Sequence, residues 1–326
     1  MSKIKSIVTG GAGFIGSNLV DRLLNDGHEV VIIDNLENDE SYQRIKSKAF
    51  SGWNNDNPIL INQDIATMTD FSTFENANGM FHLAALPQVQ PSINNPIKYH
   101  SVNVNGTLNM LVACKELGIK RFIFSSSSAV YGDVKTFPTN EDSDVNPVSP
   151  YGLHKLIGEQ YCQLFNNIYG METFSLRYFN VFGPRQPLKG PYSLVIGKFA
   201  NQLLNKLPLT INGDGEQRRS FTYVKDVVDA LLKMSGLEKS HTFNVGSNMT
   251  VSLNDVIKLI EEYSGKSANI ENLERAYKDP DVVRPDLKNI KKIIGWEPTT
   301  SIEEGVEKTV AWYKKNEGYL KDLVYL

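Results

Sequence analysis

The sequence has little cysteine, no long apolar run and no excess of basic charge. Its 326 residues include only 2 cysteines, Cys114 and Cys162, which have neither the spacing of metal ligands nor that of a disulfide framework. A net charge of -3 argues against sequence-independent nucleic-acid binding, which needs a basic surface. No apolar run is long enough to cross a bilayer, and the N-terminal stretch leaves no room for a signal peptide. We expect a soluble, cytoplasmic protein that binds no nucleic acid, membrane or metal.

Short apolar segments alternate with helical patterns over the first 130 or so residues. "KSIVTGG", "EVVIIDN", "PILINQDI", "GMFHLAAL" and "KRFIFSSSS" are typical of strands, and "GFIGSNLVDRLLNDG" and "VNVNGTLNMLVACKELGI" carry apolar residues at helical spacing. Strands that are apolar on both faces need helices on both sides. The pattern predicts an α/β protein with a doubly wound parallel sheet.

The pattern changes after residue 180. "GPRQPLKGPYS" is rich in Pro and Gly and is typical of a loop at a domain boundary. We expect a nucleotide-binding domain over residues 1–180, with a return segment near 226–248 that includes the strand "HTFNVGSN". A second domain is expected over 181–326, ending in an amphipathic helix capped by Ser301.

The stretch "TGGAGFIG" places Gly10, Gly13 and Gly16 between a predicted strand and a predicted helix. Glycines there allow a tight turn and a close approach of backbone N–H groups to a pyrophosphate at the helix N-terminus. Asp34 follows Gly16 by 18 residues, where an acid can bind a ribose 2′-hydroxyl. Its charge would repel a 2′-phosphate, so the sequence favours NAD over NADP.

"SPYGLHK" places Tyr151 and Lys155 on one helix face. A tyrosine ionises near pH ~10, and a neighbouring ammonium group together with the positive nicotinamide would lower that pKa and make the phenol a usable base. The serines of "FIFSSSSAVYG" end the preceding strand and could present a hydroxyl to a substrate oxygen. Together these residues predict a catalytic site.

The chain resembles the extended short-chain dehydrogenases that modify nucleotide sugars, the NAD-dependent epimerase/dehydratase family. The resemblance rests on "TGGAGFIG", "HLAA", "NVNGT", "SSSSAVYG", "YGLHK", "RYFNVFGPRQ", "GDGEQRRSFTYVKD" and "IIGWEP", in that order. It implies a Rossmann-type sheet that holds NAD and a smaller α/β C-terminal domain that grips a UDP-sugar. Within the family the resemblance is strongest to UDP-glucose and UDP-N-acetylglucosamine 4-epimerases.

The resemblance also implies roles for individual residues. It makes Tyr151 the catalytic base, Lys155 its partner and Ser127 the catalytic hydroxyl. Positions implied to bind the cofactor are Gly10, Gly13, Phe14, Ile15, Gly16, Asp34, Asn35, Asp64, Ile65, Leu83, Ala84, Ala85, Asn103, Ser125, Tyr151, Lys155 and Tyr178. Positions implied to bind the substrate are Ser127, Ser128, Tyr151, Asn180, Val195, Arg219 and Arg284.

Ser128 and Ala129 bear on the reaction type. By resemblance, the 4,6-dehydratases carry an acid pair at these two positions, and the UDP-glucuronate decarboxylases carry a Glu at the second. Neither residue here has a carboxyl group, which favours epimerisation at C4 through a 4-keto sugar. "VVRPDLKNIKKIIGWEP" resembles the decarboxylases about as well as the epimerases.

"GPYSLVIGKF" resembles a segment of epimerases that act on UDP-N-acetylglucosamine and sometimes on UDP-glucose. The alternatives are a UDP-glucuronate decarboxylase or epimerase, a 4-keto reductase, a CDP-sugar 2-epimerase and a non-catalytic NAD-binding regulator. The resemblance also implies a homodimer formed through the helix that carries Tyr151.

Overall fold

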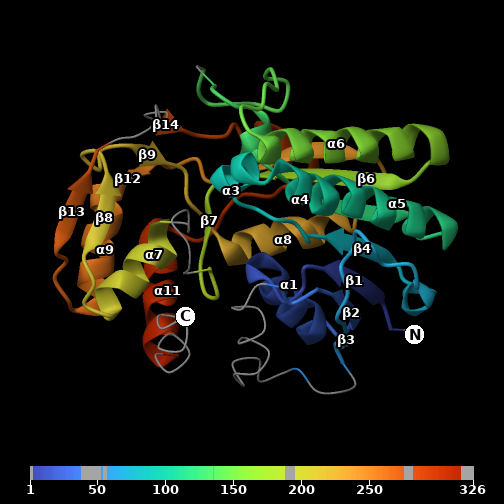
Figure 1. Ribbon diagram of the computed structural model, residues 1–326, viewed down its shortest axis with the longest axis horizontal. Coiled ribbons are helices and arrows are strands. Elements are labelled where there is room, and N and C mark those ends of the chain that lie inside the picture. The colour runs from blue at the N-terminus through green and yellow to red at the C-terminus, as the bar shows by residue number, and fades with distance from the viewer. Residues whose placement is uncertain are drawn as a thin grey trace. The chain divides into compact units, whose positions relative to one another are not determined.

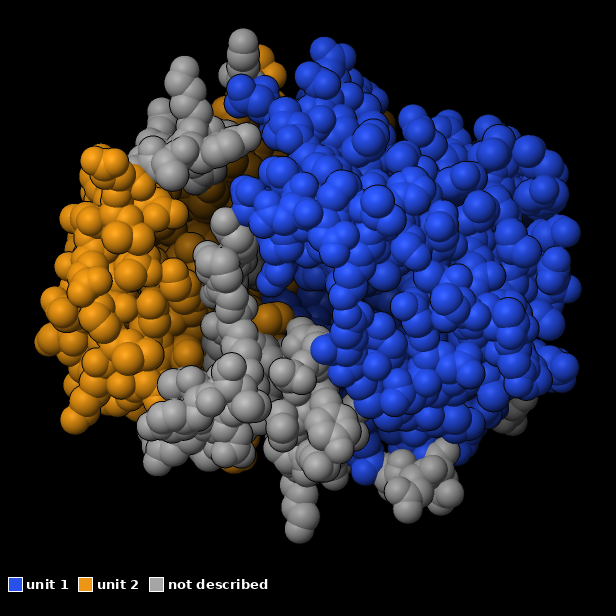
Figure 2. Space-filling view, in the orientation of Figure 1, with its two compact units in different colours: residues 1–133, 141–178, 228–243 blue, residues 134–140, 179–227, 244–326 orange. Residues whose placement is uncertain are grey.

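The computed structural model describes residues 3–37, 53, 57–134, 136–187, 195–274 and 282–316. The chain divides into two compact units, which Figure 2 distinguishes by colour. Unit 1 comprises residues 1–133, 141–178 and 228–243, and unit 2 comprises residues 134–140, 179–227 and 244–326. Each unit has its own cluster of buried apolar side chains. The loop expected over 183–193 lies partly outside the described residues, since 188–194 are not among them.

A seven-stranded sheet in the order β11-β6-β5-β4-β1-β2-β3 forms the centre of the part of unit 1 that the structure describes. The paired strands from β6 to β3 are parallel. The strands are β1 (Lys5–Thr9), β2 (Glu29–Ile33), β3 (Ile59–Ile61), β4 (Gly79–His82), β5 (Arg121–Ser127), β6 (Glu172–Tyr178) and β11 (His241–Val245). The doubly wound sheet predicted from the sequence is thus confirmed, and the expected return strand is β11 at its edge.

Helices cover both faces of this sheet, as the apolar strands require. The helical segments are α1 (Phe14–Asn25), η1 (Ser72–Phe74), α3 (Val89–Asn94), α4 (Pro96–His100), η2 (Ser101–Gly106), α5 (Thr107–Glu116), η3 (Ser128–Val130), α6 (Pro150–Tyr169) and α8 (Val224–Met234). The α4, α5 and α6 ribbons run along one side of the strands, and α1 lies on the other (Figure 1). Neighbouring residues such as Ile7 and Val8 point to opposite faces and are both 0% exposed.

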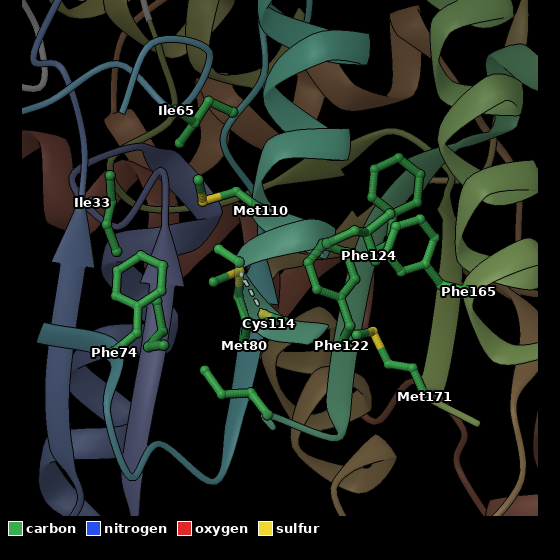
Figure 3. Packing of buried hydrophobic residues seen from close by; sticks show 14 of the residues in the cluster. Ile33, Ile65, Phe74, Met80, Met110, Cys114, Phe122, Phe124, Phe165 and Met171 are labelled. Atoms are coloured by element: carbon green, nitrogen blue, oxygen red, sulfur yellow. Dashed lines mark hydrogen bonds between the residues drawn. The ribbon is translucent and has the colours of Figure 1, made fainter. Parts of the chain in front are cut away.

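Figure 3 shows the apolar cluster between the sheet and helices α5 and α6. Met80 of β4 and Phe122 of β5 meet Cys114 of α5 there, and the Cys114 Sγ lies 3.8 Å from the Met80 Sδ. Cys114 and Cys162 are both free thiols. Burial raises the pKa of each well above its usual range, so both act as small apolar side chains in this core.

Local signals explain the bounds of α6. Ser149 precedes the helix with an extended backbone, and its side chain accepts a hydrogen bond from the Gly152 N–H. Pro150 occupies the first helical position, where its missing N–H costs nothing. Gly170 ends the helix with a φ of 67°, a left-handed conformation that glycine adopts readily.

Unit 2 is built from short strands and four helices in the ranges that the structure describes. Its elements are β7 (Val181–Phe182), α7 (Val195–Leu204), β8 (Leu209–Asn212), β9 (Arg218–Arg219), β10 (Thr222–Tyr223), β12 (Val251–Ser252), α9 (Leu253–Ser264), β13 (Ile270–Leu273), β14 (Val282–Val283), α10 (Lys288–Ile294) and α11 (Ile302–Lys315). The predicted cap is confirmed, because the Ser301 side chain accepts a hydrogen bond from the Glu304 N–H at the start of α11. Within the described ranges, no helix is both long and apolar enough to cross a membrane.

Candidate active site

The glycine-rich turn connects β1 to α1 at the carboxyl edge of the sheet. Gly10 has a φ of 69°, and a Cβ there would lie 2.7 Å from the Ala84 nitrogen. A Cβ on Gly16 would lie 2.1 Å from the Gly10 carbonyl oxygen. Both positions therefore need glycine, one for its backbone conformation and both for a close backbone approach.

The first turn of α1 has the character of an anion site. Gly13 is the N-cap and makes no side-chain capping bond, and the first turn, which includes Phe14 and Ile15, contains no acidic residue. A helix N-terminus carries a partial positive charge and outward N–H groups. The turn therefore suits the pyrophosphate of a dinucleotide.

The next two strands contribute acids at the same edge. One carboxylate oxygen of Asp34 accepts the Ala12 N–H at 3.0 Å, and the other accepts the Leu36 N–H at 3.0 Å. Asp34 therefore lies beside the glycine-rich turn, followed by Asn35, as a ribose-binding acid requires. The Asp64 carboxylate accepts the Ala66 N–H at 2.8 Å in the turn after β3. Ile65 in that turn is buried, with 3% of its surface exposed.

Asn103 lies in η2, a single π-helical turn between α4 and α5. Its side chain accepts the Leu86 N–H at 2.8 Å and donates to the Leu86 carbonyl at 3.0 Å. This pair of bonds fixes the segment that leaves β4 and contains Leu83, Ala84 and Ala85. Such π turns recur at functional sites, and the sequence alone predicted an uninterrupted helix here.

The serines at the end of β5 point to different partners. The Ser125 Oγ lies 3.0 Å from the Tyr178 hydroxyl of β6. Ser126 faces the other way and donates to the buried carboxylate of Glu159. The Ser127 Oγ accepts the Ala129 N–H at 3.2 Å, at the start of η3, which begins with Ser128. Alternation along the strand thus places Ser125 and Ser127 on one face.

Helix α6 brings Tyr151 and Lys155 to these serines. The Tyr151 side chain lies close enough to that of Ser127 for Ser127 to lower its pKa, and the Lys155 Nζ donates to the Ser125 carbonyl at 2.7 Å. Both residues are buried, with 8% and 5% of their surfaces exposed. Ser92 of α3 accepts the Tyr151 N–H at 3.1 Å and so fixes the first turn of α6. The predicted catalytic residues Ser127, Tyr151 and Lys155 are therefore brought together.

The expected effect of Lys155 on the pKa of Tyr151 is not the one in the structure. Burial raises the pKa of Tyr151, and the hydrogen bond from Ser127 opposes that rise. Burial also lowers the pKa of Lys155 from 10.5 to about 8, against the opposing charge of Glu159. The ammonium group is directed at the Ser125 carbonyl and does not by itself lower the pKa of Tyr151 in the protein.

A buried ion pair under the site was not found from the sequence. Glu159 lies one turn beyond Lys155 on α6, and its carboxylate receives the Arg177 guanidinium of β6 at 2.9 and 2.7 Å. Arg177 also donates to the Tyr131 hydroxyl at 2.9 Å. The recurrence Tyr151, Lys155, Glu159 at intervals of four is a signal that could have indicated this residue.

The remaining predicted substrate residues belong to unit 2. The Asn180 side chain donates to the Ser220 carbonyl at 3.0 Å, and its backbone has a φ of 37°. Arg219 of β9 pairs in register with Val283 of β14, directly before Arg284. Asn180, Arg219 and Arg284 therefore lie on adjoining segments, whereas Val195 packs against the apolar core of this unit.

Among the residues that the structure describes, no group of three or more His, Cys, Asp or Glu side chains could hold a metal ion. The groups that unit 1 brings together at this edge of the sheet fit a dinucleotide. They are a glycine turn at a helix N-terminus, a ribose-side acid, and polar side chains at the carboxyl ends of β5 and β6. All of them lie outside the carboxyl ends of parallel strands, where open α/β sheets bind ligands.

Comparison with known proteins agrees with this geometry. Residues 6–246 match the model of the "NAD dependent epimerase/dehydratase family". A putative UDP-glucose 4-epimerase from Methanocaldococcus jannaschii is 37% identical over 317 residues, which are 95% of this chain and 98% of that protein. UDP-glucuronic acid decarboxylase 1 from Xenopus tropicalis is 34% identical over 314 residues, which are 95% of this chain and 72% of that protein.

Solved structures show the same fold. The UDP-N-acetylglucosamine 4-epimerase from Methanobrevibacter ruminantium M1, in complex with UDP-N-acetylmuramic acid, superposes with a TM-score of 0.88 at 35% identity, covering 97% of this chain and 99% of that one. The UDP-glucuronic acid 4-epimerase from Bacillus cereus, in complex with UDP-glucuronic acid and NAD, gives a TM-score of 0.86 at 32% identity, covering 96% and 99%.

Proposed function

Because the chain belongs to the NAD-dependent epimerase/dehydratase family, we propose that this NAD-dependent epimerase inverts C4 of a UDP-hexose. The proposed substrates are UDP-N-acetylglucosamine, UDP-glucose or both, with their galacto isomers. The observation that carries the proposal is the proximity of the Ser127 side chain to buried Tyr151, on the helix that also carries buried Lys155, with no carboxyl group at positions 128 and 129.

The proposed roles follow from these contacts. Tyr151 removes the proton of the 4-hydroxyl as hydride leaves C4, and it returns that proton once hydride has come back to the opposite face. Ser127 holds the substrate oxygen during both steps. The bound cofactor supplies reversible hydride transfer at C4. Because burial raises the pKa of Tyr151, the positive charge needed to favour its phenolate comes in part with the bound cofactor.

The residue after Ser128 supports epimerisation over its main alternative. A decarboxylase removes a carboxyl group from the sugar, and the resemblance gives that family a Glu where this chain has Ala129. The carbonyl oxygen of Ala129 lies so close to Gly152 that a Cβ there would approach it to 2.5 Å. Gly152 is thereby a second small residue beside the catalytic serines. The identity to UDP-glucuronic acid decarboxylase 1 keeps UDP-glucuronate among the substrates that must be tested.

We assign NAD binding to unit 1 and UDP-sugar binding to unit 2. Support for the second assignment is the cluster of Asn180, Arg219 and Arg284 on adjoining segments, since guanidinium groups bind phosphate bidentately. Val195 packs against the apolar core of this unit, which gives it a structural role and supports its assignment to substrate binding less well.

The test is incubation of the purified protein with UDP-N-acetylglucosamine, UDP-glucose or UDP-glucuronate, with the anomeric protons followed by NMR. We expect the galacto isomer of at least one hexose, without release of carbon dioxide and without net formation of NADH. Release of carbon dioxide from UDP-glucuronate would show a decarboxylase instead.

Tyr151→Phe removes only the hydroxyl and should lower turnover by about 10²- to 10⁴-fold. Tyr169→Phe is the matched control, since Tyr169 lies on the same helix but is 52% exposed. Full turnover by Tyr151→Phe would refute the catalytic assignment.

We further propose a cytoplasmic homodimer. Support comes from exposed apolar residues on α3, α4 and α6, among them Ile97, Leu164 and Ile168, which are 83%, 46% and 59% exposed. A patch of this kind is typical of an interface. Sedimentation at micromolar concentration should show a dimer, and the double variant Leu164→Glu/Ile168→Glu should be monomeric. A monomeric parent protein would reject the proposal.

A further inference from the structure

His82 lies at the point where the strand order of the sheet reverses. It is the last residue of β4 and pairs in register with Thr9, the last residue of β1. Only 1% of its surface is exposed, and its ring stacks on Phe124 with a centroid separation of 6.0 Å. Ligands of open α/β sheets bind at such a reversal, so a buried polar residue there lies directly under the cofactor positions.

The hydrogen bonds of Thr9 and Thr107 fix the state of this histidine. The Thr9 hydroxyl accepts the Ala84 N–H at 3.1 Å and shares the Leu83 N–H, at 3.2 Å, with the Thr9 carbonyl, at 3.1 Å. A hydroxyl has two acceptor lone pairs and one proton. The one proton of the Thr107 hydroxyl goes to the Asn103 carbonyl, so this hydroxyl must accept from the His82 Nε2. The Nδ1 of the neutral ring then accepts the proton of the Thr9 hydroxyl, whose Oγ1 lies 2.9 Å away.

The hydrogen bonds on the other side of the His82 ring are donated in the same direction. A neutral imidazole that accepts at Nδ1 carries its proton on Nε2. The Nε2–H then donates to the Thr107 Oγ1 at 3.0 Å, and the Thr107 hydroxyl donates to the Asn103 carbonyl at 2.8 Å. Burial and the charge of Lys155 lower the pKa of His82 to about 3, which agrees with a neutral ring.

We infer that His82 is a positioning residue for NAD, acting through a hydrogen-bond chain that runs in one direction from Thr9 through His82 and Thr107 to Asn103. The chain joins three segments: the glycine turn, the end of β4 and the π turn. The inference rests on the proposed assignment of these segments to the cofactor. His82 itself touches none of the reacting atoms.

These segments pack closely, so their positions relative to one another depend on the hydrogen bonds that run from Thr9 to Asn103. Gly10 approaches Ala84 so closely that a Cβ would lie 2.7 Å from the Ala84 nitrogen, and Asn103 holds both backbone groups of Leu86. A shift at Thr9 or Thr107 is therefore passed to the backbone on both sides of the cofactor. An apolar residue at position 82 would leave the Thr9 proton and the Thr107 lone pair without their partner, and the segments would move to satisfy them.

The first test is nitrogen-15 NMR of the histidine-labelled protein, with and without added NAD, assigned with a His82→Gln variant. We expect His82 to show the Nε2–H tautomer, with shifts that stay constant over about pH 5.5 to 8.5. An Nδ1–H tautomer, or titration of His82 within this pH range, would contradict the proposed direction of these hydrogen bonds. This result does not depend on the reaction that the protein catalyses.

The second test measures the dissociation constant of NAD by equilibrium dialysis. His82→Phe keeps a ring beside Phe124 but removes both nitrogens, and Thr107→Val removes only a hydroxyl. Each should weaken NAD binding by about tenfold or more. His82→Gln, which can accept and donate, should recover most of the affinity. Unchanged NAD affinity in folded His82→Phe and Thr107→Val would reduce His82 to a structural role and overturn the inference.

His28→Gln is the matched control, because the His28 Nδ1 also meets a hydroxyl of β1, that of Ser6 at 2.9 Å, away from the carboxyl edge. Its NAD affinity should equal that of the parent protein. If the parent protein itself bound no NAD, the proposed function would fail, while the NMR result would still decide the state of His82.

Discussion

Replacing Arg177 with methionine should lower the free energy of unfolding by about 3 to 5 kcal/mol, because it leaves the Glu159 carboxylate buried without its partner. The two side chains are each only 7% exposed. The guanidinium meets the carboxylate as a fork, with Nε to Oε1 at 2.9 Å and Nη2 to Oε2 at 2.7 Å. Removing one member of such a pair costs far more than the pair contributes when it is intact.

A double variant separates the two effects. Arg177→Met/Glu159→Gln removes both charges, and the amide can still accept the hydrogen bond from Ser126. We expect it to be more stable than Arg177→Met alone, although the hydrogen bond that Arg177 donates to the Tyr131 hydroxyl is still lost, at a cost of about 1 to 3 kcal/mol. The two substitutions should therefore be strongly non-additive.

The assay is urea unfolding followed by circular dichroism, with the free energy extrapolated to water. The matched control is Glu29→Gln, which breaks the pair between Lys5 and Glu29, whose side chains are 18% and 42% exposed. Exposed pairs contribute about 0 to 1 kcal/mol. The reasoning fails if Arg177→Met costs no more than Glu29→Gln, or if the double variant shows the sum of the two single effects.

Three further predictions concern the cofactor side of unit 1. Gly16→Ala should abolish NAD binding in equilibrium dialysis, since its Cβ would lie 2.1 Å from the Gly10 carbonyl oxygen, whereas Gly236→Ala, whose Cβ would meet no atom nearer than 3.7 Å, should bind NAD normally. Lys155 has a pKa of about 8 in the folded protein, against 10.5 in the unfolded chain. Between these two pH values the unfolded chain keeps a proton that the folded protein has lost, so the free energy of unfolding rises with pH. At about 1.4 kcal/mol per pKa unit, the free energy of unfolding of the cofactor-free protein should rise by roughly 3 kcal/mol over this pH range relative to that of Lys155→Met. Urea titrations that show the same difference between the two proteins at every pH would contradict this. Asp34→Asn should raise the NADP-to-NAD affinity ratio about tenfold by removing the charge that repels a 2′-phosphate; an unchanged ratio would mean that Asp34 does not face the ribose.

Sequence patterns predicted the sheet because each of its strands is a local signal. Runs such as Val30 to Ile33 are apolar at every position, which indicates burial on both faces, and all four are 0% exposed in the structure. The π turn at Ser101–Gly106 had no such signal. It packs against a distant part of the chain, where Ile65 approaches Gly106 so closely that a Cβ would lie 2.7 Å from the isoleucine side chain.

The proposed catalytic residues could likewise be selected from the sequence, because Tyr151 and Lys155 are four residues apart on one helix and the serines end one strand. Their surroundings could not be predicted from it. The Lys155 ammonium was expected to act on the Tyr151 hydroxyl, but it donates to the Ser125 carbonyl, a backbone group that no side-chain pattern reveals. The pKa of Tyr151 is accordingly set first by burial, a quantity that depends on the packing of α6 against its neighbours.

The contacts that support the site are the ones that sequence patterns miss most completely, because each joins residues far apart in the chain. Thr9 and His82 are separated by 73 positions, and His82 and Thr107 by 25. Helical and strand periodicity relate residues only a few positions apart, so a threonine that ends one strand and a histidine that ends another carry no joint signal until the order of the strands is known. In the structure β1 and β4 are adjacent and parallel, and their register places Thr9 opposite His82. The proton count of the hydroxyl on the far side of the ring, that of Thr107, then determines the tautomer. The tautomer of His82 thus follows from the pairing of the strands and not from the reaction, so NMR can test it without an activity assay.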